Sequence, residues 1–335
     1  MNKIIIFLLI FGFALAGCSL RGSKPETLDP TIVESQQKEI EKLRNEVEAL
    51  EKSKSADKAS VPAKEEVKKE TKPAETAPAE IAPKETTPAE TTPAETALLD
   101  LGDFKIIYGE TQKPRYAELN KSLEDSHVFE NVASFLNNML ILQKDFPITF
   151  KECGFVNAYY TLAGKEIVMC DELLENFAFN FAYFVNSEDE LDKAITDAAF
   201  FIFFHELGHG LIDIYNLAYS GKEEDVADQL STLILANLGE SGAKAAITGA
   251  NLFYITSMQI DAGSYPFWDE HPLNQQRYYN ILCWLYGSNP QKYNDFVGMY
   301  GLPEERAGRC SREYEKISEF WGVAMEQYIK EEVKN

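Results

Sequence analysis

The sequence predicts an α+β domain with a helical majority and a small sheet, in the C-terminal part of the chain. Residues 98–335 contain enough apolar side chains to bury a large core, whereas the stretch before them does not. Short β-prone segments open this domain, and the pattern after Cys170 is helical almost to the end. The strands are expected at 104–109, 148–150, 155–161 and 166–170, and the first helix at 115–144.

The first residues predict a signal peptide that ends at a lipidation site. A short cationic start precedes an apolar run that is too short for a comfortable transmembrane helix. The sequence Leu-Ala-Gly-Cys18 then resembles the bacterial lipobox, whose cysteine is lipidated and becomes the first mature residue. We expect a lipoprotein signal peptide over 1–17 and a lipid-anchored segment over 18–31. The alternative is an ordinary signal peptide with an incidental cysteine.

Charge and the residue after Cys18 bear on the expected location. A net charge of −22 argues against nucleic acid as a partner and against adhesion to an anionic membrane surface. A covalent lipid is therefore the expected means of attachment. Ser19 follows the cysteine where inner-membrane lipoproteins carry Asp, and this resembles the outer-membrane sorting pattern. We expect an exported protein that is lipid-anchored to the cell envelope at the outer membrane.

Two low-complexity segments separate the anchor from the folded domain. Residues 32–53 place apolar side chains at coiled-coil spacing with charges between them, which predicts a short helix that self-associates or stands alone. Residues 54–97 repeat variants of Pro-Ala-Glu-Thr, which have nothing to bury and predict a disordered, extended linker.

Four cysteines follow Cys18, and an even count in an exported chain favours two disulfides. We expect Cys153 to pair with Cys170 across a hairpin, and Cys283 to pair with Cys310 between helices. Their spacings do not resemble the paired CxxC motifs of a structural zinc site.

The motif His205-Glu206-Leu-Gly-His209 is the main functional signal. Residues four apart on a helix share a face, so both imidazoles can bind one Zn²⁺, while Glu206 lies beside them and can act as general base. Ser187 and Glu190 form a possible capping box at the start of this helix. The alternative is two core histidines that are satisfied by hydrogen bonds.

A second acidic helix can complete the metal site. Glu224 and Asp228 share a helix face, so Glu224 can be the third ligand and Asp228 can orient a ligand histidine. The alternative is that Glu224, like Glu223 and Asp225, only complements the helix dipole. A metzincin is excluded, because Ile212 and Tyr215 stand where HExxHxxGxxH has Gly and the third His.

These motifs resemble gluzincin metallopeptidases, whose pattern is HExxH followed by ExxxD, and more weakly their membrane-associated type. The segments Asn157-Ala158 and His271-Pro272…Arg277 resemble segments of that type. The similarity is greater to a family of exported bacterial proteins classed as metallopeptidases of unknown function, over roughly residues 100–330. The resemblance implies a zincin-like fold. The gap between HExxH and Glu224 is shorter than in the membrane type, so its substrate class does not carry over.

Four more residues are candidates for contact with substrate. His271 and Arg277 can stabilise a tetrahedral oxyanion; the alternatives are a plain loop residue and an ion pair to an acidic helix. Asn157 and Tyr159 lie on a segment that can pair with an extended peptide, unless the segment is purely structural.

Together these patterns predict a membrane-tethered lipoprotein that hydrolyses peptide bonds with Zn²⁺, metal-activated water and Glu206 as general base. Its partners are then a peptide or protein substrate, a lipid anchor and, through residues 32–53, a second copy of the chain. The alternatives are a metal-free or inactive binding lipoprotein and a zinc amidase that acts on cell-wall peptides.

Overall fold

The computed structural model of the protein describes residues 98–259 and 267–334. The signal peptide, the lipidation site Cys18, the coiled-coil-like helix and the linker predicted within residues 1–97 lie outside the described residues. Within the described ranges, no helix combines the length and the apolar character that a membrane span requires.

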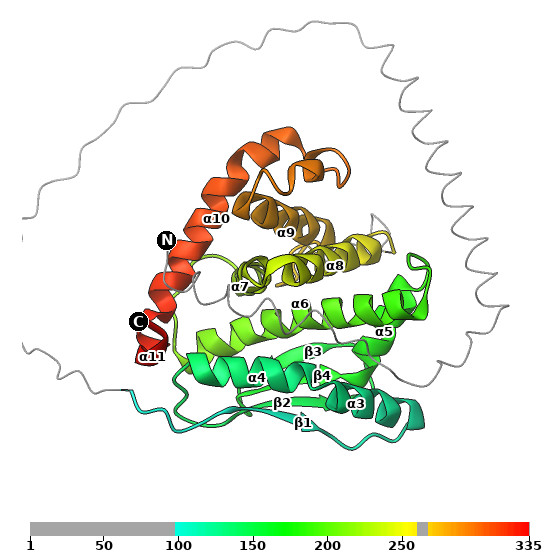
Figure 1. Cartoon of the computed structure of the whole chain (residues 1–335), viewed down its shortest axis with the longest axis vertical. Coiled ribbons are helices and arrows are strands. Elements are labelled where there is room, and N and C mark those ends of the chain that lie inside the picture. Colours follow the sequence, from blue (N-terminus) through cyan, green and yellow to red (C-terminus); the bar gives the residue numbers. More distant parts are fainter. Residues whose placement is uncertain (1–97, 260–266, 335) are drawn as a thin grey trace, which may run out of the picture. The chain divides into compact units, whose positions relative to one another are not determined.

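Four strands form one mixed sheet in the order β1-β2-β4-β3 (Figure 1). Strand β1 (Phe104–Tyr108) pairs in parallel with β2 (Phe146–Lys151), and β2 pairs in parallel with β4 (Glu166–Cys170). Strand β3 (Ala158–Thr161) pairs antiparallel with β4 and lies at the edge of the sheet. The predicted α+β class with a helical majority is confirmed.

The helix predicted over 115–144 is wrong as a single element. The structure has α3 (Pro114–Ser126) and α4 (Val128–Met139), separated by His127 in a left-handed conformation with φ 54°. The His127 N–H bonds to the carbonyl of Glu124 and closes the first helix. Both helices are amphipathic, and the helical spacing of apolar residues continues across the break. The break therefore cannot be recognised from the apolar pattern of the sequence.

Helix α5 (Asp171–Phe181) leads from β4 to α6 (Glu188–Ile214), the central helix of the domain. The hydroxyl of Ser187 accepts a hydrogen bond from the Glu190 N–H, as the predicted cap requires. The Glu190 carboxylate accepts from the N–H of Asn186 rather than from that of Ser187. Helix α6 packs against the sheet on one side and against later helices on the other, which explains its run of four phenylalanines and an isoleucine.

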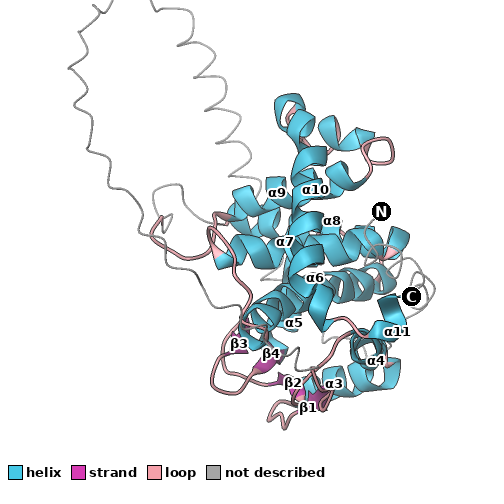
Figure 2. Cartoon of the chain, turned by 90° about the vertical axis from the view of Figure 1, so that its left-hand side faces the viewer, coloured by secondary structure: helices cyan, strands magenta, loops and turns pink. Residues whose placement is uncertain are grey.

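Helices α7 to α10 stack on the side of α6 that faces away from the sheet (Figure 1). Helices α7 and α8 pack directly on α6, α9 packs on both, and α10 crosses α9 along the side of the stack, as Figure 2 shows. Their bounds are α7 Glu223–Asn237, α8 Gly239–Ser257, α9 Asn274–Ser288, α10 Glu304–Met325 and α11 Glu331–Lys334, with short 3₁₀ helices at Asn294–Val297 and Glu326–Tyr328.

Two disulfides join the cysteine pairs that the sequence predicts. Cys283 on α9 bonds to Cys310 on α10, between helices as expected. Cys153 bonds to Cys170, but not across a hairpin. Cys153 follows β2 and Cys170 ends β4, and these two strands are parallel neighbours. The first disulfide therefore ties together the carboxyl ends of two parallel strands.

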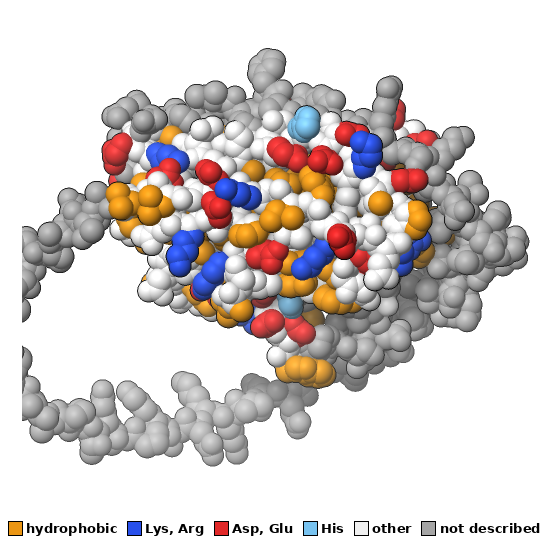
Figure 3. Space-filling view, turned by 90° about the horizontal axis from the view of Figure 1, so that it is seen from below, with side chains coloured by type: hydrophobic (Ala, Val, Ile, Leu, Met, Phe, Trp, Pro, Cys, Tyr) orange, Lys and Arg blue, Asp and Glu red, His pale blue; other side chains and the backbone are white. Residues whose placement is uncertain are grey.

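The large negative charge is not gathered on the sheet side of the domain. Seen from below, this face carries acidic and basic side chains interspersed among apolar ones (Figure 3).

Candidate metal centre

The motif on α6 lies in the most deeply buried part of that helix. His205 is 3% exposed and Glu206 is 7% exposed, and the residues before them are almost all buried. Helix α7 approaches this segment closely at Gly208. A Cβ at position 208 would lie 2.9 Å from the backbone Cα of Ala227, so only glycine allows the two helices this separation. The small separation of α6 and α7 places the first turn of α7 beside both histidines.

Two imidazole nitrogens and one carboxylate converge where α6 and α7 meet. His205 Nε2 lies 3.3 Å from His209 Nε2 and 3.2 Å from Glu224 Oε2, and His209 Nε2 lies 3.4 Å from Glu224 Oε1. Zinc bonds of about 2.0–2.1 Å in a tetrahedron place neighbouring ligand atoms about 3.3 Å apart. His205, His209 and Glu224 could therefore hold one zinc ion without rearrangement. In addition, the buried Oε2 of Glu224 makes no hydrogen bond within the described ranges.

The outer nitrogen of each histidine is bound by a carboxylate. His205 Nδ1 lies 2.8 Å from Asp228 Oδ1, which is the supporting contact that the sequence predicts. His209 Nδ1 lies 2.7 Å from Glu223 Oε1. The sequence predicts only a helix-dipole role for Glu223, and this contact with His209 goes beyond that prediction. Each pairing directs Nε2 inward and fixes the orientation of the ring, as carboxylates behind metal-binding histidines do.

The charges around His205 favour its protonated form when no metal is bound. Burial lowers the pKa of His205, but the hydrogen bond and charge of Asp228, with Glu224, outweigh burial and raise the pKa to about 9. Burial opposes ionisation of Asp228, yet the charge of Arg277 and the contact with His205 hold its pKa below the usual range. The pKa of Glu224 is also lowered, because its contacts with His205 outweigh burial. A cation at this position replaces the proton on His205 Nε2.

Arg277 does not occupy the position expected of an oxyanion donor. Its side chain is buried and donates to both oxygens of Asp228, at 2.8 and 2.6 Å, while its guanidinium stacks over Phe253. It therefore lies on the Nδ1 side of His205, away from Glu224. The alternative considered from the sequence, an ion pair to the acidic helix, is what the structure shows.

His271 reaches the candidate centre from the loop before α9. Its Nε2 lies 3.4 Å from Glu224 Oε2, and its side chain is 51% exposed. Asp269 Oδ1 accepts the backbone N–H of His271 and lies 2.8 Å from its Nδ1. His271 is thus on the solvent side of Glu224, while the other two histidines are on the protein side.

Asn157 directly precedes β3 and Tyr159 lies in it, and this strand runs beside α6 at the edge of the sheet. Tyr160 in β3 donates to Asp213 on α6 at 2.6 Å, just beyond the histidine motif. Asn157 is exposed, and the Tyr159 ring stacks on Phe155. The described hydrogen bonds join neither residue to the three-ligand group, so their expected contact with substrate stays a prediction.

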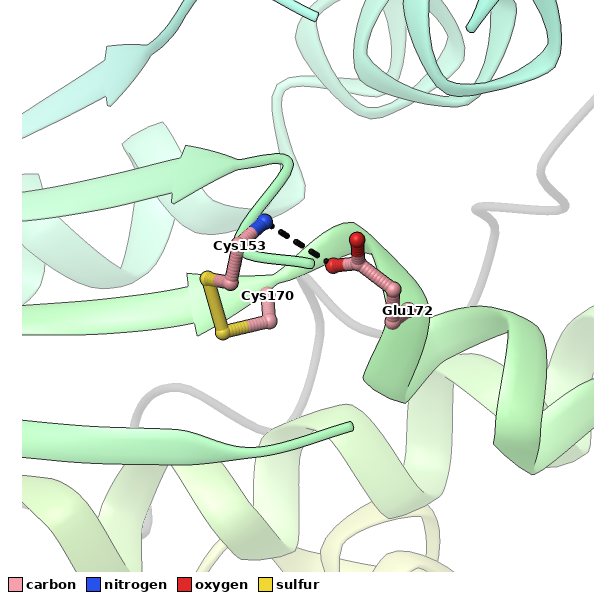
Figure 4. Close-up of side chains that lie close together, drawn as sticks. All are labelled: Cys153, Cys170 and Glu172. Carbon is pink, nitrogen blue, oxygen red and sulfur yellow. Dashed lines mark hydrogen bonds between the residues drawn. A yellow bond between two sulfur atoms is a disulfide. The ribbon is translucent and has the colours of Figure 1, made fainter. Parts of the chain in front are cut away.

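A second cluster of sulfur and carboxylate groups has a structural role. Cys153, Cys170 and Glu172 lie together (Figure 4), but the two sulfurs are bonded to each other and offer no thiolate. The Glu172 carboxylate accepts the N–H groups of Cys153 at 3.0 Å and Gly154 at 2.8 Å. It fixes the turn that follows β2.

Comparison with known proteins adds one finding. A family model described as "Putative metallopeptidase" matches residues 108–325, which is more than half of the chain and contains both α6 and α7. No curated protein and no solved structure matches the chain.

Proposed function

The chain belongs to this metallopeptidase family, and on that premise we propose that it hydrolyses peptide bonds with a zinc ion held by His205, His209 and Glu224. The observation that carries the proposal is the convergence of two imidazoles and one carboxylate, with contacts of 3.2–3.4 Å between each pair of groups. Two imidazoles and one carboxylate form the donor set of open, catalytic zinc sites. The pattern HExxH with a glutamate on the next helix is that of gluzincins.

When bound, zinc supplies Lewis acidity to the scissile carbonyl and lowers the pKa of water. Glu206, next to His205 on α6, takes a proton from the attacking water and passes it to the leaving amine. It is buried among the helices, which hold its side chain in place beside the ligand histidines. His271 donates from Nε2 to the developing oxyanion, and Asp269 holds its ring in place at Nδ1.

Arg277 and Asp228 act through His205 rather than on the substrate. The bidentate ion pair fixes Asp228, and Asp228 in turn fixes the tautomer and the orientation of the His205 ring. An extended peptide is expected to lie along β3, because this edge strand has unpaired backbone groups on its outer side.

Metal analysis of the purified full chain tests the proposal. We expect about one tightly bound zinc per chain, which His205→Ala, His209→Ala or Glu224→Ala each removes. Asp225→Ala, one position along α7, is the matched control and keeps the zinc. Zinc retained in Glu224→Ala but lost in Glu223→Ala contradicts the assigned ligand set.

We also propose that Cys18 carries a lipid and that residues 54–97 let the enzyme reach away from the outer membrane. The support is the Leu-Ala-Gly-Cys motif and the composition of the linker. Labelling with a fatty-acid analogue in a bacterial host tests this: the wild-type chain incorporates label, and Cys18→Ala does not. Equal labelling of both chains, or of neither, contradicts the anchor.

A further inference from the structure

His271 has the same arrangement of contacts as the two buried histidines. In each of the three rings, Nδ1 lies 2.7–2.8 Å from a carboxylate oxygen, supplied by Asp228, Glu223 or Asp269. In each, Nε2 lies 3.2–3.4 Å from an oxygen of Glu224. A carboxylate on the outer nitrogen is the usual support of a metal-binding histidine. The loop therefore presents His271 in the form that a metal ligand takes.

Glu270 completes a second group of possible ligands around Glu224. One ligand atom from each of Glu224, Glu270 and His271 lies within 4.8 Å of the other two. Opposite ligands of one divalent ion at about 2.0–2.4 Å are separated by roughly that distance. Glu224 can serve both groups, because its Oε2 lies 3.2 Å from Nε2 of the inner His205 and 3.4 Å from Nε2 of His271. Oε2 is buried, and within the described part of the chain its contacts with these two rings lack hydrogen-bond geometry, so a cation shared by the imidazoles and Oε2 would satisfy it.

We infer that Glu224, Glu270 and His271 form a second, outer site for a divalent metal ion, which shares Glu224 with the inner site. The inference rests on the proposed function for the inner ion and its ligand Glu224. The contacts of Glu270 and His271 with Glu224 stand independently of it. An imidazole with two carboxylates suits a borderline ion such as Zn²⁺ better than Mg²⁺ or Ca²⁺. The acidic side chains of Glu223 and Asp269 lie against the rings of His209 and His271 and add negative charge that attracts cations.

The outer site binds more weakly than the inner one. Glu270 and His271 are exposed, whereas His205 and Glu224 are 3% and 8% exposed. An exposed site keeps water ligands and lacks the low dielectric that strengthens ionic contacts in the interior. The two ions also repel each other across one carboxylate. The inner site therefore fills first, and the outer site fills at higher free zinc.

Filling the outer site inhibits the enzyme. An ion on His271 Nε2 replaces the proton that the mechanism uses at the oxyanion. Glu224 then shares its charge between two ions. Because Glu270 and His271 are on the solvent side of Glu224, the outer ion also lies where substrate reaches the inner one. Excess zinc is thus a reversible inhibitor that acts through Glu270 and His271, together with the shared ligand Glu224.

Zinc titration of the metal-free full chain by calorimetry tests the inference. We expect two successive equivalents in the wild type, the second weaker. Glu270→Gln keeps the first equivalent and weakens the second about tenfold or more, because loss of a ligand costs at least as much as loss of an outer-shell partner. Glu304→Gln, an exposed carboxylate at the start of α10, is the matched control and binds both equivalents like the wild type.

Peptidase activity against free zinc gives the second readout. Glu270→Gln keeps the wild-type rate at one equivalent of zinc, and its inhibition shifts to about tenfold higher zinc or beyond. A single equivalent in the wild type, or inhibition at the same zinc concentration in both chains, overturns the outer site. If His205→Ala still binds the first equivalent of zinc, the proposed function is contradicted instead. The outer site is then still tested separately, by whether binding of the second equivalent depends on Glu270.

Discussion

Asp228 Oδ1 lies 2.8 Å from Nδ1 of His205, on the side of the imidazole ring opposite the ligand atom that faces Glu224. Asp228 is 1% exposed and is held in turn by two hydrogen bonds from Arg277. Asp228→Asn keeps the size of the side chain but removes the charge that makes Nε2 a strong donor. We expect zinc affinity to fall by about 10–100-fold, measured by competition with a chelating dye. Affinity equal to the wild type contradicts the role of Asp228.

Glu223 supports His209 as Asp228 supports His205, but from a partly exposed position. Glu223→Gln leaves a neutral acceptor at Nδ1, and water can take part of its place. We therefore expect a smaller loss of zinc affinity than in Asp228→Asn, about tenfold. Asp225→Asn is the neighbouring control and should change affinity little. A larger loss in Asp225→Asn than in Glu223→Gln contradicts the assignment of Glu223.

Gly208 sets the separation of α6 and α7 at the site. In Gly208→Ala the added Cβ meets the backbone of Ala227, so α7 moves and carries Glu224 with it. We expect loss of about 1–3 kcal/mol of stability and weaker zinc binding, read by thermal melting and metal analysis. Gly308→Ala is the matched control, because a Cβ at that helical position meets nothing within 4 Å. It should stabilise the chain slightly; similar behaviour of the two variants contradicts the close-approach argument.

Asp171 makes stability depend on pH in the direction opposite to most carboxylates. It is buried at the start of α5, and neither carboxylate oxygen makes a hydrogen bond within residues 98–259 and 267–334. Burial and the charge of Glu172 raise its pKa to about 7. Between pH 4 and 7 the folded chain binds more protons at this site than the unfolded chain, so its contribution destabilises as pH rises.

Asp171→Asn removes this ionisation. We expect the variant to gain stability over the wild type at pH 8, by about 1–3 kcal/mol, and to gain little at pH 4. Denaturant unfolding at both pH values measures the difference. Asp125→Asn, an exposed carboxylate paired with Lys121, should change stability slightly at either pH. A gain that is larger at pH 4 contradicts the assigned pKa.

Much of the candidate site could be predicted because it depends on helix periodicity alone. His205 and His209 are four residues apart, as are Glu224 and Asp228, so each pair shares a face in any α-helix. The contact of Asp228 with His205 then requires only that these faces of α6 and α7 pack against each other. The cysteine pairing also agrees with the prediction, although the strand topology behind Cys153–Cys170 does not.

The remainder depends on packing between distant elements, which local patterns do not encode. The orientation of Arg277 follows from the way α9 packs on α7 and α8. The contact of Glu223 with His209 follows from the direction in which the chain enters α7. The parallel pairing of β2 with β4 requires a connection that passes beyond β4 to the edge strand. The break at His127 is a single left-handed residue within a continuous apolar pattern. None of these has a periodic signal in the sequence.

The most direct test of the central claim is turnover of a mixed peptide library by wild type and Glu206→Gln at equal zinc loading. Glutamine keeps the size of the side chain and leaves all three ligands in place, so zinc content and melting temperature should hardly change. Loss of the general base should lower the rate by about 10²–10⁴-fold. Equal cleavage by the two chains, or no cleavage by the wild type, would contradict a peptidase that uses Glu206 as its base.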